Sequence, residues 1–191
     1  MAMPVLYFDL GSPYAHLAVA RAERVLGVAP DLQPVLLGAL FQRRDSGSWA
    51  RTAERAAGMA EVERRAAAYG LPPVRWPAVW PGDGLAVMRA ATWARREGDG
   101  AAFAHAAFDR AFAQGGDLSD VATIAAVAAA AGLDGERVPA AIADPEVKGA
   151  LRAATDAAWD AGVRGIPTLR IGERLWFGDD RLDEAAGATA P

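Results

Sequence analysis

The chain has no cysteine among its 191 residues, only two histidines, and Lys148 as its single lysine. Without a thiol it can form no disulfide framework and no cysteine nucleophile, so dithiol–disulfide exchange is excluded. Two histidines without cysteine also argue against a zinc site. The longest apolar run, the Ala-rich stretch 121–132, is too short to cross a bilayer, and residues 1–10 carry no targeting pattern. We therefore expect a cytoplasmic protein with no membrane partner.

The composition is that of an ordinary globular protein. Apolar residues make up 52% of the chain, charged residues 23%, and the net charge is -4. This length suffices for one large domain or two small ones with a buried core. The arginines are scattered rather than clustered, so we expect no nucleic-acid partner.

The first forty residues predict a β-α-β unit. Residues 5–10 form an apolar run typical of a buried strand, and residues 13–26 follow helical spacing. Ser12 is a suitable N-cap for this helix, and Gly27 is suited to end it. Residues 32–37 predict a second strand, in which Pro34 favours an edge position or a bulge. Strands joined in this way are expected to pair in parallel.

The rest of the chain predicts a block of helices followed by a return to the sheet. A β-hairpin is predicted for 168–171 and 174–177, with its turn at 172–173. The helices are expected at 49–69, 85–97, 101–114, 120–131, 135–143 and 145–161. The predicted fold is therefore α/β, a thioredoxin-like four-stranded mixed sheet formed by residues 1–42 and 144–191. Residues 43–143 are expected to form a large all-helical insertion.

Two segments are the strongest candidates for a functional site. Ser12 lies between the first strand and the first helix, and the segment 165–168 (GIPT) precedes the third strand. The purely structural interpretation is that Ser12 only caps its helix. The alternative is that its hydroxyl donates to the thiolate of a bound molecule, at a helix N-terminus that already favours an anion. Together the segments indicate a thioredoxin-type site with serine in place of the redox cysteine, which favours a bound thiol such as glutathione.

Pro167 allows two interpretations. Only about 5–6% of X-Pro bonds are cis in folded proteins, so frequency favours trans. In the cis form, the main chain of Ile166 would face outward and could pair with an extended peptide, as in strand addition.

Several charged residues could contact such a peptide. Asp179 and Asp180 begin the last predicted helix, where they could act as N-caps or where one could hold the ammonium of a γ-glutamyl group. Arg43 and Arg44 follow the second strand and could be solvated surface groups or bind a carboxylate.

Four further residues have structural and functional interpretations. Asp9 is either a buried acid with a role or a turn residue. A packing role is favoured for His16 over catalysis. Trp76 and Trp80 could line an aromatic substrate pocket, although core or loop packing is the more common role of such residues.

Several segments resemble one protein family over nearly the whole chain. Residues 8–14 (FDLGSPY) look like the start of 2-hydroxychromene-2-carboxylate isomerases and the related kappa-class glutathione transferases. Residues 162–168 (GVRGIPT) and 177–182 (FGDDRL) resemble the C-terminal signature of that family. The segments 36–41, 117–120 and 131–134 also match in place.

The resemblance implies a DsbA-like thioredoxin fold with glutathione as cofactor. It implies that Ser12 activates the glutathione thiol, that Pro167 is cis with Ile166 pairing the peptide, and that Asp180 binds the γ-glutamyl end. The reaction implied is isomerisation of 2-hydroxychromene-2-carboxylate, a small aromatic carboxylate, to trans-o-hydroxybenzylidenepyruvate, with the thiolate as a borrowed nucleophile. It also implies a homodimer.

The chain departs from this family at two glutathione contacts. Relatives usually carry an asparagine after the position of Phe41, where this chain runs through Ser46, and another near Asp83, yet the chain has no asparagine. Ser46 is the candidate contact at the first position. Two alternatives stay open: a kappa-like glutathione transferase or peroxidase acting on another electrophile, and a non-catalytic thioredoxin-like binding module.

Overall fold

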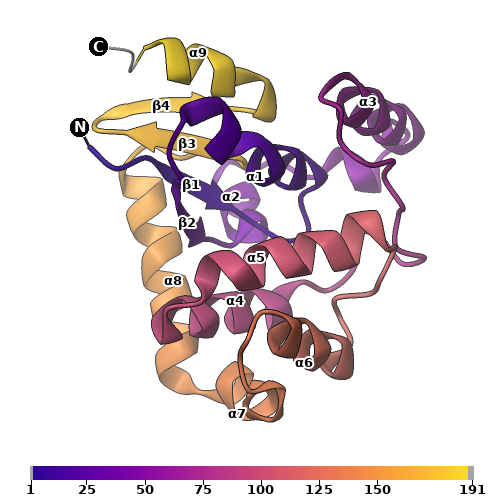
Figure 1. Ribbon diagram of the computed structural model, residues 1–191, viewed down its shortest axis with the longest axis vertical. Helices are drawn as coiled ribbons and strands as arrows, with labels where there is room; N and C mark the ends of the chain where they lie inside the picture. Colours follow the sequence, from indigo (N-terminus) through magenta and orange to yellow (C-terminus); the bar gives the residue numbers. More distant parts are fainter. Residues whose placement is uncertain (1, 189–191) are drawn as a thin grey trace.

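The computed structural model describes residues 2–188 and contains a four-stranded mixed sheet (Figure 1). The strands lie in the order β2-β1-β3-β4, with β1 parallel to β2 and antiparallel to β3. Their bounds are Val5–Phe8 for β1, Asp31–Pro34 for β2, Thr168–Ile171 for β3 and Arg174–Phe177 for β4. The predicted mixed sheet, the parallel first pair and the final hairpin are confirmed.

Helix α1 (Pro13–Leu26) joins β1 to β2 and is capped as predicted. The Ser12 Oγ accepts the Ala15 N–H at 3.2 Å. Gly27 ends the helix at φ 71°, a left-handed conformation that glycine adopts without strain. Pro34 lies on the edge strand β2, where a residue without an N–H removes no hydrogen bond from the sheet.

The second predicted strand is too long, because Leu37–Arg43 form a short helix, α2. The sequence provides no side-chain cap before it, and Leu36 at the cap position has none. Its first N–H groups are instead satisfied from distant parts of the chain. The Leu36 N–H donates to Thr155 Oγ1 at 3.1 Å and the Leu37 N–H to Asp9 Oδ2 at 2.8 Å. Acceptors so far away in sequence leave no local helix signal.

The predicted helical block is present with two corrections. The helices are α3 (Arg55–Ala68), α4 (Leu85–Glu97), α5 (Gly100–Phe108), α6 (Val121–Ala130), α7 (Val138–Ala143) and α8 (Pro145–Asp160). The helix predicted for 49–69 is broken into a 3-10 turn, Trp49–Arg51, and α3, because Thr52 takes an extended conformation. The helix predicted for 101–114 consists of two segments, α5 and a π-helical turn that follows it at Asp109–Ala113.

The helical block and the sheet share one hydrophobic core. In Figure 1, α4–α7 gather on the side of the sheet away from the β3–β4 hairpin and α9 (Leu182–Gly187), and α3 stands beside α1. Buried side chains of the sheet, such as Leu6 and Phe8, belong to the same cluster as Phe103 and Phe112. The division at 42/43 and 143/144 stays a prediction. In the part of the chain described here, no helix is long and apolar enough to span a bilayer.

Candidate functional site

The sheet brings the two candidate segments together at one end of its central strands, β1 and β3. Tyr7 of β1 lies opposite Thr168 of β3, so one further step of this antiparallel register places Phe8 opposite Pro167. The loop that leads from β1 to Ser12 therefore meets the loop that leads into β3. The peptide bond between Ile166 and Pro167 is cis. The family resemblance implied this isomer, whereas the general frequency of X-Pro bonds favoured trans.

Ser12 lies at the N-terminus of α1 and is 4% exposed. Its oxygen caps the helix, which confirms the capping role. The hydroxyl hydrogen has no acceptor among residues 2–188, so the group can still donate to a ligand. The two interpretations of Ser12 are therefore compatible.

Asp9 is a buried turn residue that fixes the loop before Ser12. Its two carboxylate oxygens accept the Gly11 and Leu37 N–H groups, both at 2.8 Å. Burial raises the pKa of Asp9, while these two hydrogen bonds oppose that rise. Asp9 thus links the loop to the start of α2.

The main chain of Ile166 is free to pair with a ligand. Within the described residues, no group forms a hydrogen bond with its N–H or C=O. The next carbonyl, that of Pro167, accepts the Gly178 N–H at 2.9 Å. This bond places the turn containing Asp179 and Asp180 beside the cis-proline loop.

The predicted capping role of Asp179 is wrong, and its predicted contact with a γ-glutamyl group stays a prediction. It is 1% exposed, caps no helix, and accepts hydrogen bonds from Arg65 Nη1 and the Tyr69 hydroxyl, both at 2.9 Å. Burial raises the pKa of Asp179, and the bond from Tyr69 and the charge of Arg65 oppose the rise. Because both partners lie at the C-terminal end of α3, more than a hundred residues earlier, no local pattern pointed to this arrangement. Each carboxylate oxygen accepts a hydrogen bond from within the protein.

Asp180 remains accessible beside it. Its side chain is 52% exposed, and Oδ2 lies 3.6 Å from Arg65 Nη1. Gly178 precedes this turn at φ 111°, and a Cβ there would lie 2.4 Å from Asp180 Oδ1. The positive φ of this residue favours glycine at the start of the turn.

Arg21 was missed by the sequence analysis, although it completes the Asp179 cluster. Its guanidinium lies 3.5 Å from the centre of the Tyr69 ring and donates to the Asp179 carbonyl at 3.1 Å and to Asp183 Oδ2 at 2.9 Å. The only signal was a basic residue on the otherwise apolar face of α1, since Arg21 is 5% exposed.

Ser46 lies in the turn that follows α2, close in sequence to Arg43 and Arg44. It is exposed, and its N–H donates to the Phe41 carbonyl at 3.0 Å to close the last turn of α2. Nearby, Arg44 Nη1 donates to the Arg164 carbonyl at 2.8 Å, and Arg43 forms an ion pair with Asp156. Two guanidinium groups of α2 and its end therefore lie near the segment that precedes Ile166.

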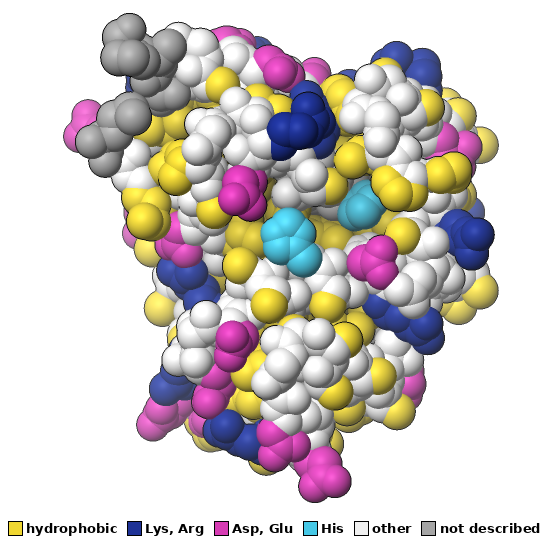
Figure 2. Space-filling model, in the orientation of Figure 1, with side chains coloured by type: hydrophobic (Ala, Val, Ile, Leu, Met, Phe, Trp, Pro, Cys, Tyr) yellow, Lys and Arg dark blue, Asp and Glu magenta, His cyan; other side chains and the backbone are white. Residues whose placement is uncertain are grey.

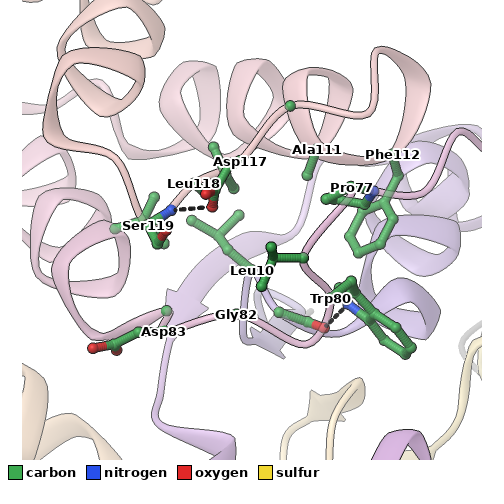
Figure 3. Close-up of a pocket in the computed structure, with 15 residues that line it drawn as sticks. Leu10, Pro77, Trp80, Gly82, Asp83, Ala111, Phe112, Asp117, Leu118 and Ser119 are labelled. Carbon is green, nitrogen blue, oxygen red and sulfur yellow. Dashed lines mark hydrogen bonds between the residues drawn. The ribbon is translucent and has the colours of Figure 1, made fainter.

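An apolar cleft opens beside the Ser12 loop (Figure 3). Leu10 and Gly11 lie against one side, Trp80 and Phe112 against another, and Trp80 Nε1 donates to the Gly11 carbonyl at 3.2 Å. The empty space of the cleft is about 380 Å³, its open mouth included. Trp80 thus lines a cleft, the less favoured of its two interpretations, whereas Trp76 packs against Trp80 with 4.7 Å between the ring centres.

His16 packs against aromatic rings as predicted. Its ring centre lies 5.8 Å from that of Phe108 and 5.4 Å from that of Phe112, and its Nδ1 is buried without a partner. Burial lowers the pKa of His16 to about 4, against the attraction of Asp109. Both histidines are visible on the face shown in Figure 2, next to hydrophobic surface.

Replacing His16 with phenylalanine should make the stability less dependent on pH. The folded-state pKa is about 4 against an ordinary value of 6.5, so the unfolded state binds more protons in this window. The wild type should therefore lose about 2 kcal/mol relative to His16→Phe as pH falls from 6.5 to 4. Urea denaturation of both proteins across this range measures the difference. Parallel curves would show that His16 is protonated equally in both states.

Comparisons with known proteins agree with this architecture. The family model of the DSBA-like thioredoxin domain matches residues 5–190. A curated relative, 2-hydroxychromene-2-carboxylate isomerase of Sphingobium xenophagum, is 29% identical over 183 residues, which cover 93% of this chain and 92% of the relative.

Two solved structures resemble the chain throughout. A 2-hydroxychromene-2-carboxylate isomerase superposes with a TM-score of 0.87 at 21% identity, covering 97% of this chain and 93% of the other. A probable DsbA oxidoreductase from Streptomyces coelicolor superposes with a TM-score of 0.80 at 22% identity, covering 100% and 92%. At these identities the likeness shows the fold alone. The fold, the cis-proline loop and the family match together show that the chain belongs to the DSBA-like thioredoxin domain family.

Proposed function

We propose that the chain is a glutathione-dependent isomerase that converts 2-hydroxychromene-2-carboxylate to trans-o-hydroxybenzylidenepyruvate. The observation that carries this proposal is the hydroxyl of Ser12, with its hydrogen unpaired, at a helix N-terminus across from the free main chain of Ile166. The similarity to the Sphingobium isomerase over 93% of the chain supports this choice of reaction.

The residues around this loop fit the three parts of glutathione. The Ile166 N–H and C=O can pair with the cysteinyl residue in the manner of an added strand. The half-exposed Asp180 offers a carboxylate to the γ-glutamyl ammonium. Arg44 and Arg164, joined by a hydrogen bond, offer guanidinium groups to the glycyl carboxylate. Ser46 is a further candidate contact at this end.

Bound in this way, glutathione would supply a thiolate nucleophile for the conjugated substrate. The role of the protein is to hold the sulfur of glutathione in its ionised form. A free thiol has a pKa of about 8.5, and a helix N-terminus with a hydroxyl donor lowers it. The Ser12 hydroxyl and the N-terminus of α1 supply both, and Asp9 and Trp80 keep the loop in place by binding the main chain of Gly11.

The charge of the cleft favours a second candidate, a kappa-like glutathione transferase or peroxidase. Its charged lining consists of Asp83 and Asp117, with no arginine or lysine among the lining residues that the structure describes. Two carboxylates would repel an anionic substrate and accept an uncharged electrophile. For the isomerase, Arg55 is one cation beside the lining residues, since it lies 5.7 Å from the centre of the Trp80 ring.

One set of assays separates these candidates. The purified protein is incubated with glutathione and either hydroxychromene carboxylate or a neutral chloronitrobenzene electrophile, with glutathione omitted as the control. Glutathione-dependent turnover of the chromene supports the isomerase, and turnover of the electrophile alone supports the transferase. Glutathione binding without turnover of either would point to the binding module. The homodimer stays a prediction.

Replacing Asp180 with asparagine should weaken glutathione binding by about tenfold, because a charged hydrogen bond to the ammonium is lost. The melting temperature should stay within a degree or two, since the Asp180 side chain is half exposed. Calorimetric titration of the variant with glutathione and with cysteinylglycine provides the measurement. The affinity for cysteinylglycine, which has no γ-glutamyl group, should not change; an equal loss for both thiols would remove Asp180 from this role.

A further inference from the structure

Arg65 of α3 has one side of its guanidinium unused beside the candidate glutathione site. Nε donates to Glu61 Oε1 at 2.7 Å and Nη1 to Asp179 Oδ1 at 2.9 Å. Nη2 forms no hydrogen bond within residues 2–188, and it is not among the buried unpaired atoms. With 24% of its side chain exposed, Arg65 can therefore still bind an anion from solvent.

The surroundings hold this guanidinium in one place. Glu61 and Asp179 bind it from two sides, and it lies 5.3 Å from the centre of the Tyr14 ring. Tyr14 is two residues beyond Ser12, so the guanidinium of Arg65 lies near the helix start that would hold the thiol. A donor fixed in this way loses little side-chain entropy when it binds.

Asp180 places an opposite charge next to this donor. Its Oδ2 is 3.6 Å from Arg65 Nη1, and both side chains are accessible to solvent, 52% exposed for Asp180 and 24% for Arg65. The free end of a γ-glutamyl group carries an ammonium and a carboxylate on the same carbon. A neighbouring carboxylate and guanidinium match that pair, and a guanidinium binds a carboxylate through two parallel hydrogen bonds.

We propose that Arg65 binds the α-carboxylate of the γ-glutamyl group while Asp180 binds its ammonium. The helical insertion would then take part in recognising the bound thiol, rather than only covering the sheet. This assignment rests on the proposed glutathione site, and it makes Arg65 a specificity residue for γ-glutamyl thiols. Thiols without a γ-glutamyl group, such as cysteinylglycine, would gain no affinity from Arg65.

The direct test changes the ligand before the protein. Calorimetric titration of the wild type compares glutathione with an analogue in which the γ-glutamyl α-carboxylate is a carboxamide. The analogue should bind about tenfold more weakly, because the charged pair with Arg65 is lost. Equal affinity for the two ligands would overturn the role of Arg65 and leave the glutathione site standing. Failure of the wild type to bind either ligand would instead overturn the glutathione site itself.

Variants then assign the effect to Arg65. In Arg65→Gln the tenfold preference should disappear, and in Arg65→Lys, which keeps a charge beside the buried Asp179, it should shrink. Arg64→Gln is the matched control, since Arg64 also pairs with Glu61 but is 67% exposed and has no contact with Asp180. Loss of the preference in Arg64→Gln, or its survival in both Arg65 variants, would contradict the assignment.

Discussion

Replacement of Ser12 with alanine should lower kcat by about a hundredfold or more at saturating glutathione, the usual effect of removing one donor to a developing or stabilised anion. The free energy of unfolding should fall by only about 0.5–2 kcal/mol, because the substitution removes one hydrogen bond of the helix cap, that from the Ala15 N–H. Initial rates and urea denaturation of the same two preparations give both quantities.

Two further readouts separate the chemical role of Ser12 from its structural one. The thiolate absorbance of bound glutathione, followed against pH, should show a higher thiol pKa in Ser12→Ala than in the wild type. Ser12→Thr keeps both the hydroxyl and the cap and should retain most of the activity. If alanine lowers activity only in proportion to the folded fraction, Ser12 is merely a cap.

Replacement of Asp179 with alanine should have the largest effect on stability, a loss of about 3–5 kcal/mol. The change leaves Arg65 and the Tyr69 hydroxyl without their shared acceptor in a site where Asp179 is 1% exposed. It also removes the two hydrogen bonds by which the C-terminal end of α3 binds the Asp179 side chain. Chemical denaturation of the two proteins at neutral pH measures the difference.

The neighbouring Asp180 supplies the control for this prediction. Asp180→Ala removes a carboxylate one residue away whose side chain is 52% exposed, and the free energy of unfolding should change by less than about 1 kcal/mol. Stability and ligand binding should thus divide between the two residues, Asp179 with the first and Asp180 with the second. Equal destabilisation by both alanine variants would contradict this division.

Local signals were sufficient to predict much of the fold. The predicted strands at 168–171 and 174–177 match β3 and β4, and the predicted helices at 13–26 and 85–97 match α1 and α4. Ser12 caps α1 as predicted, and Asp120 and Asp144 cap α6 and α8 in the same way, because capping depends on residues within one turn. Ser12 and Ile166 also meet at one end of the central strands β1 and β3, as expected for a thioredoxin-type site.

The features that were missed depend on contacts between distant residues. Helix α2 begins with its N–H groups bound to Asp9 and Thr155, so nothing in its own sequence marks the start. Asp179 binds Arg65 across 114 positions of the chain. Two adjacent aspartates before a helix look alike in sequence, and only the packing of α3 makes one a buried ion-pair partner and leaves the other accessible.

The central claim is that a thioredoxin-type site without cysteine binds a thiol at Ser12. Calorimetric titration of the wild-type protein with reduced glutathione tests it most directly. Saturable binding at one site per chain, at micromolar to low millimolar concentrations and weakened in Ser12→Ala, is the result that we predict. A folded protein that shows no saturable heat with glutathione would contradict the account.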